Sequence, residues 1–467
     1  MSDPGPTVFW HRRDLRLEDN RGLREAAGSG TVAPVLVLDP EIRAPAGAAR
    51  DGFYVASAAA LQRQYRAIGA DLTIRVGDPR SEIPAVVAET GADRLVYNAD
   101  YSKLATRRDR DVEEAVPTGV ESVAVPDLAA HEPGSIRTTA GDHYSVFSYY
   151  YKKWADRDPG TPIVAPEGSS FLETTARDVH DVAGSVPEEL PIPAGRRAAL
   201  DRLDRFLDGP IFEYAEARDV PSAEGTSRLS QDLSMGLLGI REVIQAVNEA
   251  ETRAESGAER DSVEEFRRQL GWRDFYLQVL AAHPETVTEN FKDYENPIAW
   301  RDAPEDLAAW KRGETGYPIV DAGMRQLQAE GYMHNRVRMI VAAFLTKDLQ
   351  IDWREGYRHF RANLIDHDTA NDVGGWQWAA STGTDAQPYF RVFNPMTQGE
   401  RYDPEASYIT TYVTELDGVD PEAIHSWPDL NAERREAVAA AYPGPIVDHA
   451  ARRDSAISMF ERARGED

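Results

Sequence analysis

Two segments in the second half of the chain would hold polar side chains together on one face of a helix. In residues 331–350, a step of about 100° per residue places Asn335, Arg338, Met339 and Ala342 opposite an apolar stripe. An amide, a guanidinium and a thioether suit the wall of a ligand pocket, although a mixed surface face explains them equally well. The apolar stripe consists of Val337, Ile340, Val341, Phe344 and Leu345.

Residues 264–280 also form a helical pattern with a polar and aromatic face opposite a set of packing residues. Gln269, Trp272, Arg273 and Tyr276 share one face, and a Trp beside an Arg can stack on a planar ligand while the guanidinium holds a phosphate. Taken alone, a core Trp with an Arg stem packed along it is the commoner arrangement. The residues available for packing are Phe266, Leu270 and Leu277.

Two further segments could contact a ligand. In residues 224–243, Thr226 or Ser227 is the expected N-cap of a helix whose free amides would bind phosphate, with simple capping as the alternative. Residues 364–390 hold Asp366, Asp368 and Asp372 close to two tryptophans. No cluster of histidines supports a metal there, so we expect these carboxylates to pair with an arginine or accept a ligand's ring N–H.

The bulk composition excludes several classes of protein. The chain has 467 residues, which favours two domains, and no cysteine, which excludes disulfides and thiol chemistry. Without a membrane-length apolar run or a signal-peptide pattern, we expect a cytoplasmic protein that does not enter membranes. The net charge of −27 argues either against a nucleic-acid partner or for a salt-adapted surface, and the scattered acidic residues favour salt adaptation.

The elements that must position these side chains fall into two groups. Residues 1–130 alternate apolar runs with helical stretches, which predicts an α/β domain with a doubly wound, Rossmann-like parallel sheet, but no Gly-x-Gly-x-x-Gly motif follows the first run. Residues 131–195 are predicted to be a connector, and residues 196–467 an all-α domain. The expected strands are 7–11, 33–39, 71–76, 94–98 and 121–125, with helices at 53–69 and 81–91.

Six motifs follow one another along the chain: FWHRRDLRLEDN (9–20), EGTSRLS (224–230), GWRDFY (271–276), TGYPIVDAGMRQL (315–327), YMHNRVRM (332–339) and GGWQWAASTGTDAQPYFRVFNP (374–395). In this order they resemble the photolyase/cryptochrome family, most closely its class I cyclobutane pyrimidine dimer photolyases. The resemblance covers nearly the whole chain. Asn335 and Met339 follow the pattern of dimer-repairing members rather than of those acting on (6-4) photoproducts.

The resemblance implies light-driven repair of cyclobutane pyrimidine dimers in UV-damaged DNA by a monomeric flavoprotein. Light-excited reduced FAD gives an electron to the dimer, the ring opens, and the electron returns. The dimer is flipped out of the duplex, because an enzyme that acts on a base cannot reach it inside the stack. The implied FAD contacts are Tyr214, Thr226, Ser227, Arg228, Leu229 and Ser230 at the phosphates and ribose, and Arg273, Asn335, Arg338, Asp366, Asp368 and Asp372 elsewhere, with Arg338 paired to Asp366.

The family's motifs also imply the substrate contacts and an electron path. The dimer would lie between Trp272 and Trp378, hydrogen-bonded by Asn335 and Gln269 and touched by Met339. Trp376, Trp353 and Trp300 match the tryptophan series that photoreduces the oxidised flavin. The DNA contacts would be Arg218, Arg336 and Arg391, within a basic patch formed by Arg336, Arg338, Lys347, Arg354, Arg358 and Arg361.

Two positions depart from the family's usual pattern. Gln269 stands where many relatives have Glu, and Asp372 stands where many photolyases have Asn and plant cryptochromes have Asp. A cryptochrome-like blue-light receptor is therefore one alternative. An electron-transfer flavoprotein without a DNA role, which the negative charge favours, is another.

The resemblance further implies a light-harvesting antenna pigment in the N-terminal domain. Arg12, Arg13, Asn98 and Asp100 lie near the expected carboxyl ends of strands, where such folds bind ligands. We expect a deazaflavin rather than a folate, because salt-adapted cells are often archaea that make deazaflavin.

Overall fold

The computed structural model describes residues 5–173, 175–184, 187 and 189–466, so residues 174, 185–186 and 188 of the predicted connector lie outside the description. The chain divides into two units. The first unit comprises residues 1–215, 227–285 and 365–370, and the second comprises residues 216–226, 286–364 and 371–467. These units do not follow the predicted boundaries at 130 and 195, and the division into domains stays a prediction.

A five-stranded parallel sheet forms the centre of the α/β part of the first unit. Its strands are β1 (Thr7–His11), β2 (Val32–Leu38), β3 (Thr73–Val76), β4 (Arg94–Asn98) and β5 (Glu121–Val125), in the order β3-β2-β1-β4-β5. All five predicted strands are present, with ends that differ by at most two residues. The chain reverses direction across the sheet between β1 and β4, which makes their carboxyl ends the topological switch point.

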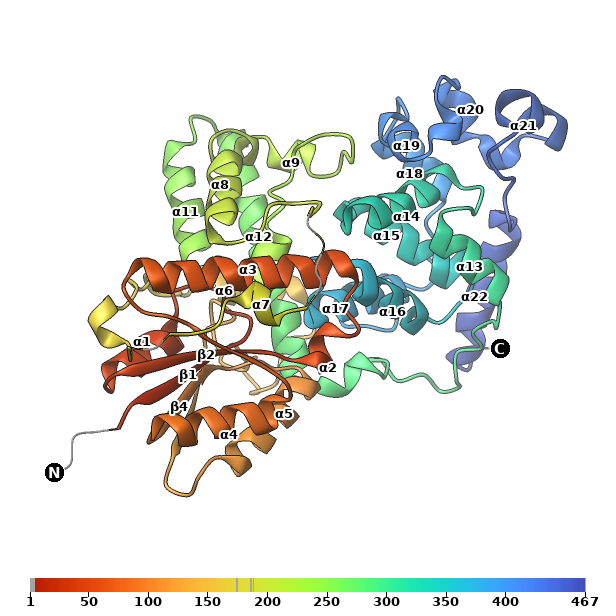
Figure 1. Ribbon diagram of the computed structural model, residues 1–467. Helices are drawn as coiled ribbons and strands as arrows, with labels where there is room; N and C mark the ends of the chain where they lie inside the picture. Colours follow the sequence, from red (N-terminus) through yellow and green to blue (C-terminus); the bar gives the residue numbers. More distant parts are fainter. Residues whose placement is uncertain (1–4, 174, 185–186, 188, 467) are drawn as a thin grey trace. The chain divides into compact units, whose positions relative to one another are not determined.

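Alternate strand residues face opposite sides of this sheet. Phe9, Leu36 and Val96 are buried with side chains of α1 (Arg21–Gly28) and α3 (Ala48–Ala67). The intervening residues, among them Trp10 and Val35, are buried with α4 (Pro79–Thr90) and α5 (Lys103–Ala115). Figure 1 shows α3 on one side of the sheet and α4 and α5 on the other. Helices on both faces of a parallel sheet confirm the predicted doubly wound fold.

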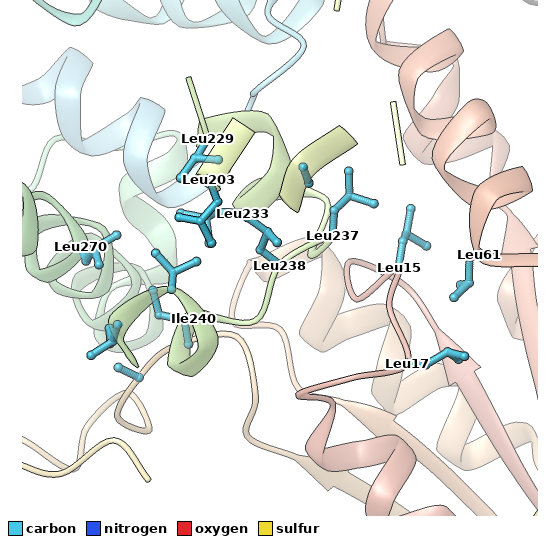
Figure 2. Close-up of a cluster of buried hydrophobic side chains, with 14 of the residues drawn as sticks. Leu15, Leu17, Leu61, Leu203, Leu229, Leu233, Leu237, Leu238, Ile240 and Leu270 are labelled. Carbon is cyan, nitrogen blue, oxygen red and sulfur yellow. The ribbon is translucent and has the colours of Figure 1, made fainter. Parts of the chain in front are cut away.

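Helices complete the first unit and share an apolar core with the loop after β1. Figure 2 shows Leu15 and Leu17 of this loop in the same cluster as Leu233, Leu237 and Leu238. Phe266, Leu270 and Leu277, predicted to pack, are buried in helix α12. The helices are α2 (Pro40–Arg43), α6 (Phe147–Ala155), η1 (Gly168–Ser170), α7 (Val179–Val182), α8 (Arg196–Leu207), η2 (Pro210–Phe212), α9 (Tyr214–Ala217), α10 (Ser230–Ser234), α11 (Ile240–Arg253), α12 (Gly257–Ala282) and η3 (Pro284–Val287).

From residue 196 onward the described residues form helices and loops, which confirms the predicted all-α fold of that part. Residues 131–195, predicted to be a connector, contain the helices α6, η1 and α7. The predicted apolar stripe, which spans α15 (Asn335–Ala343) and the π-turn η4 (Phe344–Asp348), is buried. Ala342 was expected on the polar side, which is wrong, because it packs in the core at 4% exposure. The helices are α13 (Pro304–Arg312), α14 (Pro318–Glu330), α15 (Asn335–Ala343), the π-turn η4 (Phe344–Asp348), α16 (Trp353–Asn363), α17 (Thr369–Ala379), α18 (Pro395–Tyr402), α19 (Ser407–Tyr412), η5 (Thr414–Leu416), α20 (Pro421–His425), η6 (Trp427–Asp429), α21 (Ala432–Ala439) and α22 (His449–Ala463).

Within the described residues, no helix combines the length and the apolar character that a bilayer crossing requires.

Candidate functional site

Arg13, in the loop that follows β1, is the centre of a charged cluster in the first unit. Its guanidinium pairs with Asp368, lies 3.5 Å from Asp100, and donates from Nε to the backbone oxygen of Ser234 at 3.1 Å. Burial alone would lower the pKa of Arg13, but the two carboxylates raise it above its ordinary value. Asp368, expected at the cofactor, is thereby fixed to the loop after β1.

The EGTSRLS segment folds differently from the expectation. Helix α10 begins only at Ser230, with Leu229 at the N-cap, so the expected cap at Thr226 or Ser227 is wrong. Arg228 has a φ of 51°, a left-handed conformation that delays the start of the helix. The hydroxyl of Ser230 donates to Asp366 at 2.6 Å, which brings two of the expected cofactor residues together.

Trp272 on α12 is part of an aromatic platform. Its ring stacks on Phe147 with centroids 3.7 Å apart and planes inclined by 13°, and the ring of Tyr276 lies 5.5 Å away. One face of the indole is therefore covered and its orientation fixed. On the preceding turn, the Gln269 amide donates to the Glu265 carboxylate at 3.1 Å, so Gln269 is held by its own helix.

Phe147 is not among the residues predicted from the sequence, because the composition of residues 131–195 predicts a connector. Helix α6 lies in this segment and buries Phe147, Tyr150, Tyr151 and Trp154. These residues have the spacing i, i+3, i+4 and i+7, which is the pattern of an amphipathic helix and could have revealed it.

Arg273 is anchored on the same helix as Trp272. One guanidinium nitrogen donates to the backbone oxygen of Leu128 at 2.9 Å and lies 3.3 Å from the carboxylate of Asp274. Asp274 also accepts from the indole of Trp154 at 2.9 Å. Burial lowers the pKa of Arg273 and raises that of Asp274, and the pairing opposes both shifts. The guanidinium is thus held rigidly with further donors available to a ligand.

In the second unit, the YMHNRVRM motif forms the start of α15. His334 caps the helix by accepting from the backbone N–H of Arg336 at 3.2 Å. Asn335 is exposed, and Arg338 and Met339 are half-buried, so three of the four predicted polar-face residues reach the helix surface. Nε of Arg338 donates to the backbone oxygen of Met333 at 2.7 Å.

The arginines expected to contact DNA differ in their surroundings. Arg336 makes a two-pronged contact to Asp219 at 2.6 and 3.2 Å, and its guanidinium lies 4.4 Å from the ring centroid of Tyr402. Arg218 lies 3.9 Å from the same carboxylate, whereas Arg391 is exposed. Asp219 therefore orients two of these arginines and offsets part of their charge.

The predicted basic patch is weaker than the sequence indicated. Lys347 is fully buried and cannot contribute to a surface, so its inclusion was wrong. Arg354 and Arg358 form ion pairs with Asp352 and Glu355.

The three tryptophans expected to carry electrons lie along adjoining elements of the second unit. Trp376 and Trp353 are buried and Trp300 is half-buried. Gly356, one turn after Trp353 on α16, packs against Trp376, because a Cβ there would lie 2.0 Å from the indole. The residue after Trp300 donates its backbone N–H to the oxygen of Gln350 at 2.7 Å, just before α16. The series thus runs from a buried to a half-exposed indole.

Helix α17 carries the remaining candidates in the tryptophan-rich motif. Trp378 is half-buried, 6.4 Å from the ring of Phe393, and Asp372 is 9% exposed. Gln377, between the two tryptophans, donates to the backbone oxygens of Thr286 and Glu289 and so has a structural role.

The switch point at β1 and β4 is closely packed. Arg12 donates to the backbone oxygen of Asn98 and, at 2.5 Å, to Asp109. The Asn98 amide accepts from Gly22 and donates to Asp14 and Asn20, which uses its acceptor and both donors. The cavity there measures about 20 Å³, enough for roughly one water. A pigment at this place would have to displace side chains, and the antenna contacts stay a prediction.

The side chains of both units fit the chemistry of FAD. Ser230 and Arg273 offer donors suited to phosphate and ribose oxygens, and the buried carboxylates offer acceptors for hydroxyls and ring N–H groups. The structure thus combines a doubly wound α/β sheet with a helical part whose polar and aromatic residues are compatible with a nucleotide-containing cofactor.

Comparisons with known proteins identify the family. Residues 7–167 match the family described as DNA photolyase, and residues 266–462 match the FAD binding domain of DNA photolyase. The chain is 53% identical to the deoxyribodipyrimidine photo-lyase of Halobacterium salinarum, covering 98% of this chain and 100% of that protein. It belongs to the DNA photolyase family and has that family's FAD-binding domain.

Solved structures agree over the full length. A class III photolyase from Agrobacterium tumefaciens superposes with a TM-score of 0.91 at 33% identity, covering 100% of this chain and 99% of that one. An archaeal photolyase from Sulfolobus tokodaii, solved with two FAD molecules, superposes with a TM-score of 0.83 at 32% identity, covering 98% and 100%.

Proposed function

We propose that this protein repairs cyclobutane pyrimidine dimers in DNA by light-driven electron transfer, as a deoxyribodipyrimidine photo-lyase. The observation that carries this proposal is the end-to-end likeness, at 53% identity, to a protein of that activity. FAD, when bound and reduced, supplies the light-driven electron. The chain's own residues bind the cofactor and the flipped lesion and hold both in place.

The residues of the first unit would hold the phosphates, the ribose and the lesion. Tyr214 and residues 227–230 are the proposed phosphate and ribose contacts, supported by the hydrogen bond that fixes Ser230 to Asp366. Arg273 is fixed by Leu128 and Asp274 and would add charge-assisted donors. Asp368, fixed by Arg13, would accept from the cofactor with its remaining lone pairs.

The second unit carries further residues that are proposed to contact the cofactor or the dimer. Thr226, Arg338 and Asp372 are proposed contacts of the cofactor, and the pairing of Arg338 with Asp366 stays a prediction. Asn335 would bind both flavin and dimer. Its exposed position at the start of α15 supports this role.

Recognition of the flipped dimer would rest on aromatic surfaces and amides. The dimer would stack on the face of Trp272 that Phe147 does not cover. A pre-oriented ring loses little freedom on stacking, which favours binding. Trp378, Gln269 and Met339 would complete the contacts. Arg218, Arg336 and Arg391 would bind the DNA backbone.

Repair can be tested directly. Purified protein, chemically reduced and illuminated at about 380–450 nm, where the flavin absorbs, should restore thymines in an oligonucleotide that contains one dimer. The assay should be run at salt concentrations up to about 1 M, because salt has two opposing effects. It weakens contacts to DNA phosphates, but a salt-adapted acidic protein is expected to need it to stay folded and soluble. Absence of repair by protein with FAD bound and reduced would refute the enzyme hypothesis and favour the blue-light receptor.

Photoreduction gives a separate test of the tryptophans. Trp376→Phe should abolish photoreduction of the oxidised flavin, because Phe is much harder to oxidise than Trp, and should leave repair by chemically reduced protein unchanged. Trp427→Phe replaces a tryptophan that is also fully buried but lies outside the proposed series, and is the matched control. Equal photoreduction in the Trp376→Phe variant and in wild type would remove these residues from the proposed path.

A deazaflavin antenna is proposed only because salt-adapted cells are often archaea that make deazaflavin. The absorption spectrum of the extracted chromophores would distinguish a deazaflavin from a folate or a second FAD. A monomeric state and a cytoplasmic location also stay predictions.

A further inference from the structure

A surface cavity of about 470 Å³ in the second unit has no role in the function described so far. Its volume is typical of small-molecule sites, which measure roughly 300–1,000 Å³. The rings of Tyr294, Tyr389 and Phe390 line it, together with the cations of Lys292 and Arg464. Phe390 is 61% exposed, which is unusual for so large an apolar side chain.

Gln387 gives this cavity a polar group with an unmet hydrogen bond. The side chain is 3% exposed, and its amide nitrogen donates to the backbone oxygen of Arg391. Its amide oxygen is buried and has no hydrogen-bond partner among the described residues. Buried polar atoms are nearly always satisfied, so a small shift of the Gln387 side chain toward the cavity would let this oxygen accept from an O–H or N–H group there.

The ring of Phe460 joins the cavity wall to the proposed electron path. Its centroid lies 6.0 Å from Tyr294 and 6.1 Å from Tyr389, both of which line the cavity, and 6.0 Å from Trp300. Two rings, a tyrosine of the cavity wall and Phe460, would therefore separate a molecule in the cavity from Trp300.

Lys347 adds a charged group that the repair function does not use. Its Nζ lies 3.8 Å from the centroid of Phe460 and donates to the hydroxyl of Ser381 at 2.7 Å, and Ser381 also lines the cavity. No carboxylate lies within ion-pair distance of this amine in the described part of the chain. The wall between the cavity and Trp300 is thus aromatic with one buried amine.

We propose that this cavity binds a planar, hydroxylated one-electron donor of the hydroquinone class, which re-reduces Trp300. The inference rests on the proposed role of Trp300 in photoreduction. The ring of the donor would lie against the aromatic wall, and its hydroxyl would donate to Gln387. The rim carries charges of both signs, because Asp293 and Glu295 line it together with Lys292 and Arg464. Arg464 is paired with Glu466 at 2.6 Å, which leaves the amine of Lys292 to attract the donor's electron-rich oxygens.

The electron and proton balance of this step is simple. The oxidised indole of Trp300 gains one electron, and hydroquinone loses one electron and one proton. The proton passes to water or to the exposed carboxylate of Asp293 at the rim. A second donation of the same kind would convert hydroquinone to the quinone.

Binding in the dark tests the site without relying on photoreduction. Calorimetry with hydroquinone and the FAD-containing protein should give one site with a dissociation constant of about 1 mM or tighter, reasonable for a ligand of this size. Phe390→Ala should weaken binding roughly three- to tenfold, the effect of one aromatic contact. Asp293→Trp should fill the cavity and abolish binding. Tyr149→Ala is the matched control, because Tyr149 is also 61% exposed and does not line the cavity.

Flash photolysis then tests the role of the bound donor. The rate at which Trp300 recovers should saturate with hydroquinone in wild type and in Tyr149→Ala, and saturation should be lost in Asp293→Trp. Recovery with ferrocyanide, which is neither planar nor a hydrogen-bond donor, should rise linearly in every variant.

The outcomes separate this inference from the proposed function. Undetectable hydroquinone binding, or binding unchanged by both cavity variants, would overturn the site. Binding without an effect on Trp300 recovery would overturn the donor role. A missing Trp300 signal with intact dark binding would instead refute the proposed electron path and, with it, the donor role.

Discussion

The switch point of the parallel sheet and the cavity beside Phe460 are both places where a ligand could bind, yet they are built in opposite ways. At the switch point, arginines and carboxylates pair closely and leave a cavity of about 20 Å³. Beside Phe460, aromatic rings, charged side chains of both signs and the unmatched oxygen of Gln387 surround about 470 Å³. Paired charges attract one another and close the space between them, whereas rigid rings that meet at their edges leave a hollow.

The two regions also differ in whether their buried charged side chains are paired with opposite charges. Arg16 and Arg241 share the carboxylate of Asp127, and Arg241 also donates to Asp19 at 2.7 Å. These four side chains are at most 4% exposed. In the other region Lys347 is equally buried, but it donates to the Ser381 hydroxyl rather than to a carboxylate. One region is stabilised by mutual charge compensation, and the other carries an uncompensated amine.

Breaking the compensated network should have the largest effect. Asp127→Ala leaves Arg16 and Arg241 buried without their shared carboxylate, which should lower the free energy of unfolding by about 3–5 kcal/mol. The loss should persist in molar salt, because buried pairs are only weakly screened. Urea unfolding at low and high salt measures both.

The control for this change is a surface pair. Glu355→Ala removes the partner of Arg358, whose side chain is 61% exposed, and should change stability little and only at low salt. If Asp127→Ala and Glu355→Ala lowered the free energy of unfolding equally, the buried ion pairs of Asp127 would stabilise the protein no more than a surface pair does.

The sequence predicted the sheet and the faces of α12 and α15, because alternation and helical periodicity are local signals. The sequence could not predict which side chains pair with the buried charged groups. The Asp321 carboxylate in the TGYPIVDA motif, which contributed to recognition of the family, accepts from Thr315, Gly316 and Tyr442. That motif therefore fixes a loop, although its sequence gives no indication of this.

Other site residues were missed for similar reasons. Phe147 was overlooked because its helix lies among Pro- and Gly-rich segments. Lys347 was assigned to the surface because lysine is rarely buried. The surface cavity of about 470 Å³ has Tyr294 and Tyr389 in its wall, and Phe460 packs behind them. These residues are separated by up to 166 positions in sequence, so no local pattern could predict that their rings lie together.

Titration of Lys347 should give the next largest effect. Burial, and then nearby Lys292, lower the pKa of Lys347 well below its ordinary value. The folded protein therefore binds fewer protons than the unfolded chain between the two pKa values, so stability rises with pH in this window. The slope is at most about 1.4 kcal/mol per pH unit and ends near pH 10.4, the ordinary value for lysine.

Lys347→Met isolates this contribution, because it keeps the stem and removes the charge. The difference in free energy of unfolding between wild type and variant should rise with pH from neutrality to about 10, and the variant should be at least as stable at pH 7. If the free energies of unfolding of wild type and variant changed with pH in parallel, the Lys347 amine would be stabilised by a partner in the folded protein. The difference in charge compensation between this region and the switch point would then disappear.

The smallest effect is expected at Asp348, beside Lys347 in the π-turn. Burial raises the pKa of Asp348 to about 6, although a 2.5 Å contact with Nδ1 of His449 opposes the shift. Since the folded pKa lies above the unfolded one, this carboxyl contributes stability that is fully present below about pH 4 and is lost as the pH rises through 6. Over that range the loss should be roughly 2–3 kcal/mol. Asp348→Asn should remove it, as urea unfolding between pH 4 and 7 would measure. An unchanged pH dependence in the variant would mean that His449 compensates this acid fully, and Lys347 would then be the only uncompensated group of the pair.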